Sequence, residues 1–492
     1  MDELTPLSNE TLQSVRSEIA CPTYERSALT AGILHIGVGN FHRAHQAWYL
    51  HRLMQKGLAH DWAIVGAGVR PPDAAQRERL HAQDYLTTLI ELDPNGKSAE
   101  IVGSMIEFVP VAADNAALID RMAKPDIRIV SLTVTEGGYY QDPATGEFDA
   151  AHPDIVHDAA NPDSPKTAFG AMVAALKRRR MCGHGPFTGL SCDNLQGNGE
   201  ILQRTLVGLA RLYDADLARW IEKTCTFPNS MVDCIVPATG DKELALAASF
   251  GIRDQAPVTH ENFRQWVIED DFCAGRPDWD LVGATFADTV HDHEAMKLRV
   301  LNGGHQMIAI PGDLLGLETI ASTMSHSGIA GFLSRAMADE VLPNVKDVPG
   351  NTPQSYLALI QQRFANPEII DTTRRVAFDG SSRQPGFIIP SIRDALENGQ
   401  PVEGLALMNA LWMRYCLGVR EDGSTIEPND PNWEALRDVA IKAADQPELW
   451  IEQSLYYGNL SEQPAIRDAF LKWSACLKSD GVEAALRAYS DQ

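Results

Sequence analysis

Residues 32–54 read GILHIGVGNFHRAHQAWYLHRLM, and this stretch decides the fold. Its first seven residues form the short apolar run of a buried strand, and a helical pattern occupies residues 43–54. Between them lies a turn with Gly37 and Gly39, and strand, turn and helix in this order are typical of dinucleotide binding. Gly37 permits the tight turn, Gly39 lets the backbone approach a pyrophosphate, and the helix N-terminus offers N–H groups to that anion. His42 stands where the third glycine is expected, so the fingerprint is incomplete.

The ends of two more predicted strands supply further candidates for binding a dinucleotide. Strand 62–69 is followed by Arg70 and Asp73. A carboxylate there binds the ribose of NAD, whereas an arginine neutralises the 2′-phosphate of NADP. Strand 127–134 ends in the glycine-rich loop TEGGY, at the edge where open α/β sheets bind ligands. We expect NAD, with NADP as the alternative, at a site formed by Gly37, Val38, Gly39, Asn40, Phe41, Asp73, Thr135 and Glu136.

Strands and helices continue to alternate up to about residue 280. A hairpin is predicted from residues 85–92 and 100–111 with its turn at 93–96, and helices are predicted at 113–123, 167–180 and 200–212. Strand 187–192 runs into a loop that contains Asn194. The apolar run 227–237 contains Asp233, a carboxylate that needs a partner if it is buried, and Asp233 is therefore a candidate site residue.

The pattern changes near residue 290. Strand signals nearly vanish there, and long amphipathic helices are predicted at 325–341, 353–365, 386–398, 402–418, 433–444 and 464–489. A chain of 492 residues is too long for one core, so two domains are expected. We predict an α/β fold in which residues 1–289 form a Rossmann-type NAD(P)-binding domain and residues 290–492 form a mostly α-helical domain.

The predicted helical domain opens with HDHEAMKLRVLNGGHQMIAIP, residues 291–311. On an α-helix Lys297, Asn302 and His305, together with Glu294, fall within an arc of roughly 140°. Taken singly, Lys297 or His305 fits an ordinary core helix better, but four polar groups of different chemistry on one side favour a functional site. Two adjacent glycines follow Asn302, each costing ~1 kcal/mol in a helix, which indicates that something approaches that backbone closely.

Composition excludes several classes of partner. The formal net charge of −24 argues against binding to nucleic acid or to an anionic membrane. No apolar run approaches the roughly 18 residues needed to cross a bilayer, and the acidic start MDELTPLSNETL is not a secretory signal. The eight cysteines include no CxxC pair, so we expect reduced thiols in a cytoplasmic protein.

Six segments in the same order resemble one known family. They are GVGNFHRAHQ, VSLTVTEGGYY, SCDNLQGNG, FPNSMVD, WVIEDDFCAGRPDW and MKLRVLNGGH, and together they are similar to the polyol-specific long-chain dehydrogenases. The resemblance runs from about residue 30 to the C-terminus. It implies a Rossmann-type domain followed by a helical domain, a monomer, and metal-independent, NAD(P)-linked interconversion of a polyol and its 2-ketose, with mannitol and fructose as the expected pair.

The resemblance also implies roles for single residues. Lys297 matches the general base, Asn194 and Asn302 match the amides that bind the reacting oxygen, and His305 matches a substrate-orienting histidine. Asp233 and Arg375 match sugar-binding positions, and Glu294 matches a carboxylate beside the lysine, which we expect to relay the proton to solvent. This chain departs from the pattern at Cys234, where relatives often have Arg, and at the second strand, which ends without an acidic pair.

Alternative functions remain open at this point. A zinc enzyme could use His291, His293, Glu294 and His305, but the first two point ~200° apart on a helix and no cysteine pair accompanies them. A dinucleotide-binding regulator without activity would leave Lys297 unexplained. Within the family, an arabinitol 4-dehydrogenase or a hexuronate (mannonate/fructuronate) reductase is the alternative, because an arginine such as Arg375 binds hydroxyls or a carboxylate.

Overall fold

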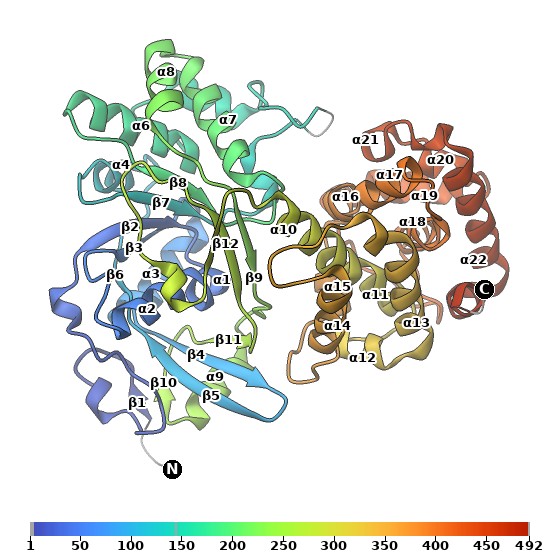
Figure 1. Ribbon diagram of the computed structural model, residues 1–492, viewed down its shortest axis with the longest axis horizontal. Coiled ribbons are helices and arrows are strands. Elements are labelled where there is room, and N and C mark those ends of the chain that lie inside the picture. Colours follow the sequence, from blue (N-terminus) through green and yellow to red (C-terminus); the bar gives the residue numbers. More distant parts are fainter. Residues whose placement is uncertain (1–3, 143–144, 491–492) are drawn as a thin grey trace. The chain divides into compact units, whose positions relative to one another are not determined.

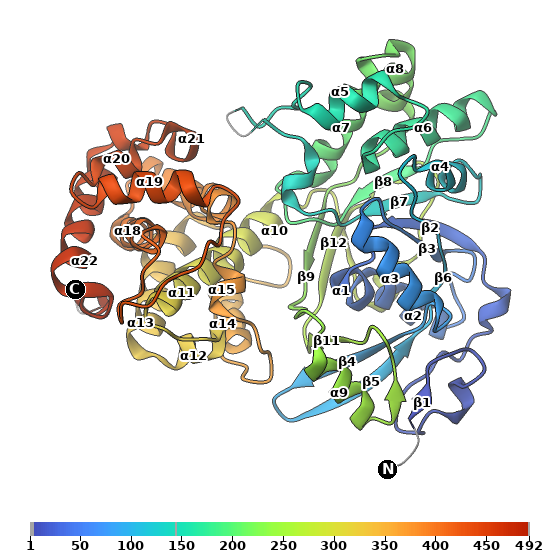
Figure 2. The same ribbon diagram turned by 180° about the vertical axis from the view of Figure 1, so that it is seen from behind.

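The computed structural model describes residues 4–142 and 145–490, apart from the side chain of Glu136. It divides into two compact units, Met1–His291 (unit 1) and Asp292–Gln492 (unit 2). Figure 1 gives the labels of the elements, and Figure 2 presents the same ribbon from behind.

A five-stranded parallel sheet organises unit 1. Its strands lie in the order β6-β3-β2-β7-β8. Their bounds are β2 (Ala31–Ile36), β3 (Ala63–Ala67), β6 (Met105–Phe108), β7 (Ile129–Leu132) and β8 (Thr188–Ser191). The order runs outward from β2 in both directions, so the carboxyl ends of β2 and β7 flank the point where the topology reverses. Ligands of such sheets bind outside that point, and the predicted Rossmann-type fold is confirmed.

Helices cover both faces of this sheet, as both ribbon views show. Successive strand residues point to opposite faces. Leu34 and Val130 pack in a core with residues of α4 (Ala116–Met122), α6 (Ala168–Met181) and α7 (Asn198–Arg211). Ile33 and Ile129 pack in a second core with α2 (Gln46–Gln55) and Trp266. The helices of unit 1 are α1 (Asn40–Ala44), α2 (Gln46–Gln55), α3 (Pro71–His81), α4 (Ala116–Met122), α5 (Pro153–Ala160), α6 (Ala168–Met181), α7 (Asn198–Arg211), α8 (Ala215–Thr224) and α9 (Asp241–Ser249).

The predicted hairpin is confirmed in its first part and wrong in its second. β4 (Thr87–Asp93) and β5 (Gly96–Val102) are antiparallel, but Met105–Phe108 form β6 of the main sheet. The chain leaves the hairpin at Gly103, where an added Cβ would lie 2.9 Å from Arg26, and at Ser104, whose hydroxyl donates to the Ala47 carbonyl. The remaining strands are β1 (Thr5–Pro6), β9 (Ser230–Asp233), β10 (Ile252–Arg253), β11 (Val258–Glu261), β12 (Gln265–Glu269) and β13 (Thr285–Ala287).

Unit 2 is helical, and no strand occurs among its described residues. Its α-helices are α10 (His291–Met296), α11 (Gly303–Leu314), α12 (Ile320–Ser325), α13 (Ser327–Ala336), α14 (Pro353–Phe364), α15 (Thr373–Val376), α16 (Gly380–Arg383), α17 (Ile389–Glu397), α18 (Glu403–Cys416), α19 (Trp433–Ala443), α20 (Glu448–Ile451), α21 (Ser454–Tyr457) and α22 (Pro464–Ser490). Nearly every residue of α11 and α18 is buried, so these two helices form the centre of the core.

Three turns of unit 2 are π-helical, namely η5 (Lys297–Asn302), η6 (Met337–Val341) and η8 (Gln384–Ile388). The helix predicted at 325–341 is confirmed from Ser327 onward: it begins two residues later than predicted, as α13, and its last turn is the π-helical η6. His326 has an extended backbone, and its ring accepts a hydrogen bond from the Ile329 N–H, which starts a new helix.

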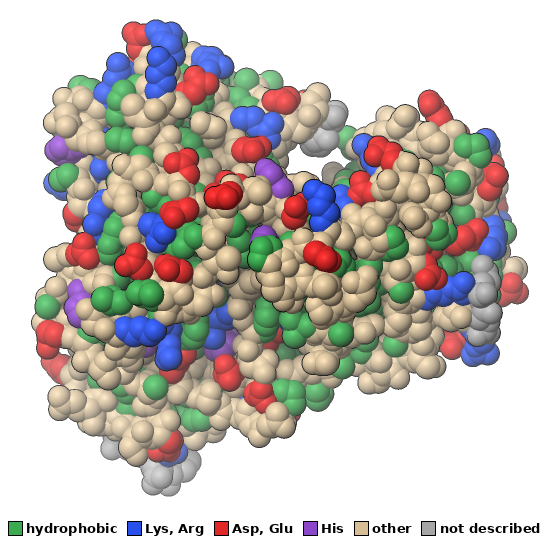
Figure 3. Space-filling model, viewed as in Figure 1, with side chains coloured by type: hydrophobic (Ala, Val, Ile, Leu, Met, Phe, Trp, Pro, Cys, Tyr) green, Lys and Arg blue, Asp and Glu red, His purple; other side chains and the backbone are tan. Residues whose placement is uncertain are grey.

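The distribution of charged side chains on the surface agrees with the acidic composition of the chain. On the face drawn in Figure 3, Asp and Glu side chains are interspersed with Lys and Arg, so the described residues there form no broad basic surface. Within residues 4–142 and 145–490, no helix combines the length and the apolar character needed to span a membrane.

Candidate functional site

The glycine turn lies at the carboxyl end of β2. Gly37 has φ +96°, and a Cβ added there would lie 2.1 Å from the carbonyl oxygen of Thr133, just beyond β7. Only glycine fits at this point, where the ends of the neighbouring strands β2 and β7 come close together. A Cβ on Gly39, by contrast, would meet nothing closer than the Gly37 oxygen at 4.0 Å. The space beside the Gly39 backbone is therefore open to a ligand.

Asn40 and Arg43 fasten this turn to the rest of unit 1. The Asn40 amide donates to the Pro237 carbonyl at 3.0 Å and to the Thr239 hydroxyl at 2.9 Å. Arg43 is buried and donates to the Gly39 carbonyl, to the Asn40 side chain and to the Ala256 carbonyl. The pattern of the sequence does not reveal the role of Arg43, because one of its acceptors, Ala256, lies far away in the chain.

Val38, Phe41 and His42 point into unit 1 instead. Val38 is 5% exposed, and Phe41 packs against the same core and stacks on His45. His42, at the third glycine position, is 1% exposed and stacks on His35 with ring centroids 3.4 Å apart. An imidazole pair thus fills the place where glycine usually allows close packing of helix and strand.

We predict that acid destabilises the protein through its buried histidines. Burial lowers the pKa from 6.5 to about 3 for His35, His51 and His260, and lowers that of His42 well below 6.5. Unfolding lets each ring bind a proton below pH 6.5, so the stability present above this pH is lost as the pH falls. The free energy of unfolding should drop by about 1 kcal/mol per histidine between pH 7.5 and 5.5. Urea unfolding at both pH values measures it, and replacing the exposed His81 should leave the drop unchanged.

Asp73 lies at the start of α3. Its Oδ2 accepts hydrogen bonds from the N–H groups of Val69 at 3.0 Å and Arg70 at 2.9 Å, so the carboxylate stabilises the helix start. Its Oδ1 lies 3.8 Å from the Arg70 guanidinium, and that side chain is 64% exposed. Binding of a ribose by Asp73 stays a prediction, and it would have to use Oδ1.

A second set of candidates follows β7 and β8. Asp193 accepts hydrogen bonds from the N–H of Val134 at 2.9 Å, the N–H of Thr135 at 3.1 Å and the Tyr139 hydroxyl at 2.7 Å. It thereby holds Thr135 in a conformation with φ +72°, rare for threonine and typical of functional loops. The side chain of Glu136 lies outside the described part of the chain.

Asn194 and Asp233 also belong to unit 1. Asn194 is exposed in the loop after β8, directly beside Asp193. Asp233 ends β9 opposite Gln265 of β12 and is 4% exposed. Cys234 is buried after it. Asp193 was not a candidate from the sequence, although a carboxylate directly before Asn194 at a strand end was a signal that could have identified it.

In unit 2, Lys297 and Asn302 are the two ends of the π-helical turn η5. The expectation of one α-helix through residues 291–311 is therefore wrong for this turn. In an α-helix two residues five apart differ by ~140° around the axis, whereas π-helical hydrogen bonds join i to i+5. Lys297 and Asn302 therefore lie one turn apart on the same side of the helix. Lys297 is 5% exposed and Glu294, one turn earlier in α10, is 2% exposed. Such π-turns are frequent at functional sites.

The two glycines after Asn302 lie against neighbouring helical turns. A Cβ on Gly303 would lie 3.5 Å from the Phe387 carbonyl oxygen, and one on Gly304 would lie 3.3 Å from the Met337 methyl group. The contact at Gly304 is tight, so a neighbouring turn accounts for that glycine, whereas the contact at Gly303 is an ordinary one that packing alone does not restrict to glycine.

His305 lies in the first turn of α11 and stacks on Phe364 at 4.1 Å between ring centroids. Its Nε2 is buried and has no hydrogen-bond partner among the described residues. Burial lowers its pKa well below 6.5, and the cations Arg375, Arg363, Arg383 and Lys297 lower it further. The ring is thus neutral at ordinary pH and can exchange a hydrogen bond with a hydroxyl. Arg363 and Arg383 were not candidates from the sequence.

Arg375 lies in the short helix α15. Its Nε and Nη2 both donate to the carboxylate of Asp371, at 2.6 Å and 2.5 Å, and the Arg375 side chain is half exposed. Asp371 is 2% exposed and therefore holds the guanidinium in one orientation. The residues of the predicted zinc alternative do not form a cluster: within the described chain, no three His, Cys, Asp or Glu side chains are grouped so as to hold a metal ion.

Comparison with known proteins covers both units. The family models of the mannitol dehydrogenase Rossmann domain and the mannitol dehydrogenase C-terminal domain match residues 31–281 and 289–474. The mannitol 2-dehydrogenase of Cereibacter sphaeroides is 56% identical over 468 residues, 95% of this chain and 98% of that enzyme.

Two solved structures are similar over nearly the whole chain. The Pseudomonas fluorescens mannitol 2-dehydrogenase, in ternary complex with NAD and D-mannitol, has a TM-score of 0.93 and 39% identity, covering 99% of this chain and 100% of that one. A D-sorbitol dehydrogenase in substrate-free form has a TM-score of 0.85 and 34% identity, covering 98% and 100%. The resemblance predicted from the six segments is confirmed, and the chain belongs to the mannitol dehydrogenase family.

Proposed function

We propose that this chain interconverts D-mannitol and fructose with NAD, using Lys297 as general base and no metal ion. Membership of the family makes it an NAD-dependent polyol dehydrogenase, and the proposal adds the substrate and the residues. Its main support is the π-helical turn, which carries a buried amine and an amide one turn apart. The relatives named mannitol 2-dehydrogenase support the choice of substrate.

The residues of unit 1 fit a dinucleotide. The backbone of Gly39 borders an open space that a Cβ would fill, and Asn40 and Arg43 hold the turn in place. NAD, when bound, accepts the hydride that leaves the alcohol carbon. Side chains of the protein would remove the hydroxyl proton, stabilise the reacting oxygen and orient the substrate.

The base has to remove the hydroxyl proton while the hydride leaves the same carbon. An uncharged Lys297 amine would accept that proton, and burial favours the uncharged form of an amine. Negative charge develops on the oxygen, and the amides of Asn194 and Asn302 would donate hydrogen bonds to it. Neutral His305 would orient a neighbouring hydroxyl through its buried Nε2. Asp233 and Arg375 would bind hydroxyls further along the sugar.

Glu294 is proposed to pass the proton from Lys297 towards solvent. Glu294→Gln keeps the shape of the side chain but removes the group that carries a proton. We expect kcat for mannitol oxidation to fall about tenfold while the KM for mannitol stays within about twofold. Steady-state kinetics measure both, with the exposed Glu434→Gln as the control. An unchanged kcat with the wild-type pH profile would make Glu294 a structural residue.

The pairing of Arg375 with Asp371 supports a neutral polyol rather than a hexuronate as the substrate. Three arginines near His305 would favour a carboxylate, but Arg375 already directs two donors at Asp371. The test is a panel of D-mannitol, D-sorbitol, D-arabinitol and D-mannonate with NAD and with NADP, before and after dialysis against a chelator. We expect the highest kcat/KM for mannitol with NAD, unaffected by the chelator. A higher value for mannonate, or loss of activity in the chelator, would contradict the proposal.

A further inference from the structure

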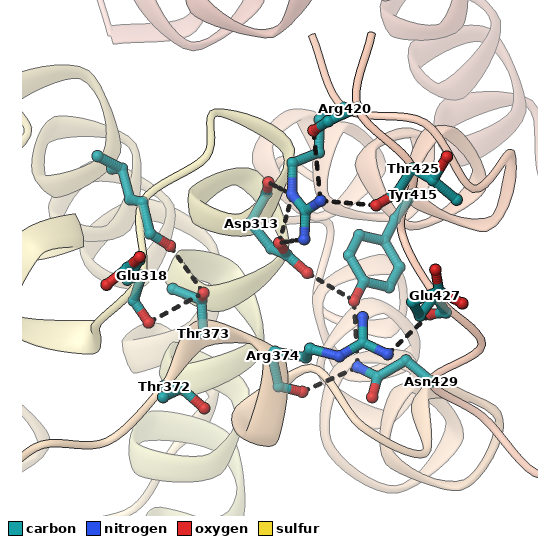
Figure 4. Close-up of polar contacts among 12 residues, drawn as sticks. Asp313, Glu318, Thr372, Thr373, Arg374, Tyr415, Arg420, Thr425, Glu427 and Asn429 are labelled. Atoms are coloured by element: carbon teal, nitrogen blue, oxygen red, sulfur yellow. Dashed lines mark hydrogen bonds and ion pairs between the residues drawn. The ribbon is translucent and has the colours of Figure 1, made fainter. Parts of the chain in front are cut away.

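A chain of buried polar groups connects α11 to α15 (Figure 4). Asp313 lies in the last turn of α11, Tyr415 in α18, and Asn429 in the loop before α19. The Tyr415 hydroxyl donates to Asp313 at 2.9 Å, and the Asn429 amide donates to the Tyr415 oxygen at 3.1 Å and to the Arg374 carbonyl at 2.8 Å. These three side chains are 3%, 2% and 6% exposed. The chain of hydrogen bonds therefore ends on the backbone next to Arg375.

The charge on Asp313 defines the direction of the hydrogen bond that it accepts from Tyr415. Arg420 donates from Nε and Nη2 to Asp313 Oδ1, at 2.9 Å and 2.7 Å, which compensates the buried carboxylate. Burial and the Asp313 carboxylate raise the pKa of Tyr415 well above its usual range, so its hydroxyl keeps the proton that it donates. Buried hydrogen bonds to a charged group are strong and directional, because water does not compete for them.

A second connection lies beside His305. The amide of Gln306, 1% exposed, donates to the carbonyl of Val376 at 2.8 Å. Gln306 follows His305 in the chain, and Val376 follows Arg375. The four residues of α15 are too few to hold a helix by themselves. This short helix is thus tied to α11 on both sides of Arg375, through the Arg374 and Val376 carbonyls.

We propose that Gln306, Tyr415 and Asn429 are positioning residues for the polyol, because they set the spacing between His305 and Arg375. This rests on the proposed function, in which these two side chains bind hydroxyls of one sugar. A fixed spacing selects the length of the polyol, since the two contacts form together only when the hydroxyls are the right distance apart. Hydrogen bonds that merely stabilised the fold would leave this selection unchanged.

The test removes single hydrogen bonds and measures selectivity. Tyr415→Phe and Gln306→Met should raise the KM for D-mannitol about tenfold and lower the ratio of kcat/KM for D-mannitol over D-arabinitol. The KM for NAD should stay at the wild-type value. Tyr457→Phe is the matched control: its hydroxyl is also buried and donates to Asn409 at 3.0 Å, but not towards α15. It should lower the Tm similarly and leave both polyol parameters unchanged.

Two outcomes would overturn the proposal in different ways. If Tyr415→Phe and Gln306→Met lose stability like Tyr457→Phe but keep the KM and the ratio, the network only stabilises the fold. Arg375→Ala is measured in parallel to test the proposed function itself. An unchanged KM for every polyol in that variant would show that Arg375 binds no sugar. That result would contradict the proposed role of Arg375, and the network would then have no sugar-binding residue to position.

Discussion

Lys297→Ala is expected to lower kcat/KM for mannitol oxidation by about 10²–10⁴-fold while NAD still binds normally. The variant removes the group that accepts the hydroxyl proton, so chemistry has to proceed with water as the base. Coenzyme binding should persist, since the proposed dinucleotide turn at Gly37 and Gly39 belongs to unit 1 and Lys297 belongs to unit 2. Steady-state kinetics give the first quantity, and quenching of protein fluorescence by NADH gives the second.

Three further measurements distinguish a base from a structural lysine. A small primary amine added to Lys297→Ala should restore part of the rate, because it can enter the vacated space and accept the same proton. The ionisation of the lysine should disappear from the pH profile of kcat. Lys346→Ala, which removes a lysine that is 77% exposed and pairs with Asp292, should behave like the wild type. If Lys297→Ala keeps full activity, or unfolds and loses NADH together, the proposed mechanism fails.

The strands and the helical unit could be predicted because their signals are local. A parallel strand such as β2 or β7 is buried on both faces and is read as a nearly continuous apolar run, interrupted by His35 in β2 and by Ser131 in β7. The position of the glycine turn follows directly from the end of β2. The prediction of the hairpin was wrong beyond Gly103, because the apolar pattern of residues 100–108 is continuous although the chain passes there from one sheet to another. The contacts that mark this change, of Gly103 with Arg26 and of Ser104 with Ala47, are not visible in the pattern.

The geometry of the candidate site could not be predicted to the same extent. A periodic pattern cannot separate an α-helical turn from the π-helical turn η5, since both place apolar residues on one side. Asp193 holds the candidate Thr135, and Gln306 holds Val376 beside the candidate Arg375, and in both cases the two partners are distant in the chain. In the sequence such residues cannot be distinguished from ordinary polar residues, because their partners come close to them only in the folded chain.

Alanine substitutions at two glycines should abolish NAD binding for two different reasons. In Gly37→Ala the new Cβ would lie 2.1 Å from the Thr133 carbonyl oxygen, at a backbone with φ +96°, so the ends of β2 and β7 must separate. We expect a lower Tm and a KM for NAD raised at least about 100-fold. In Gly39→Ala the backbone has φ −87°, and the Cβ meets nothing in the protein closer than 4.0 Å.

Gly39→Ala should therefore fold like the wild type and still lose NAD, because its methyl group occupies the space that the pyrophosphate needs. Gly57→Ala controls for backbone strain: Gly57 has φ +77° with nothing within 4 Å of an added Cβ, so it should lower the Tm and leave NAD binding intact. Calorimetric titration with NADH and thermal unfolding separate the three cases. Normal NADH affinity in Gly39→Ala would place the coenzyme away from this turn and contradict the assignment of the dinucleotide site. Loss of affinity in Gly57→Ala to the same degree would instead attribute the effect to strain in unit 1.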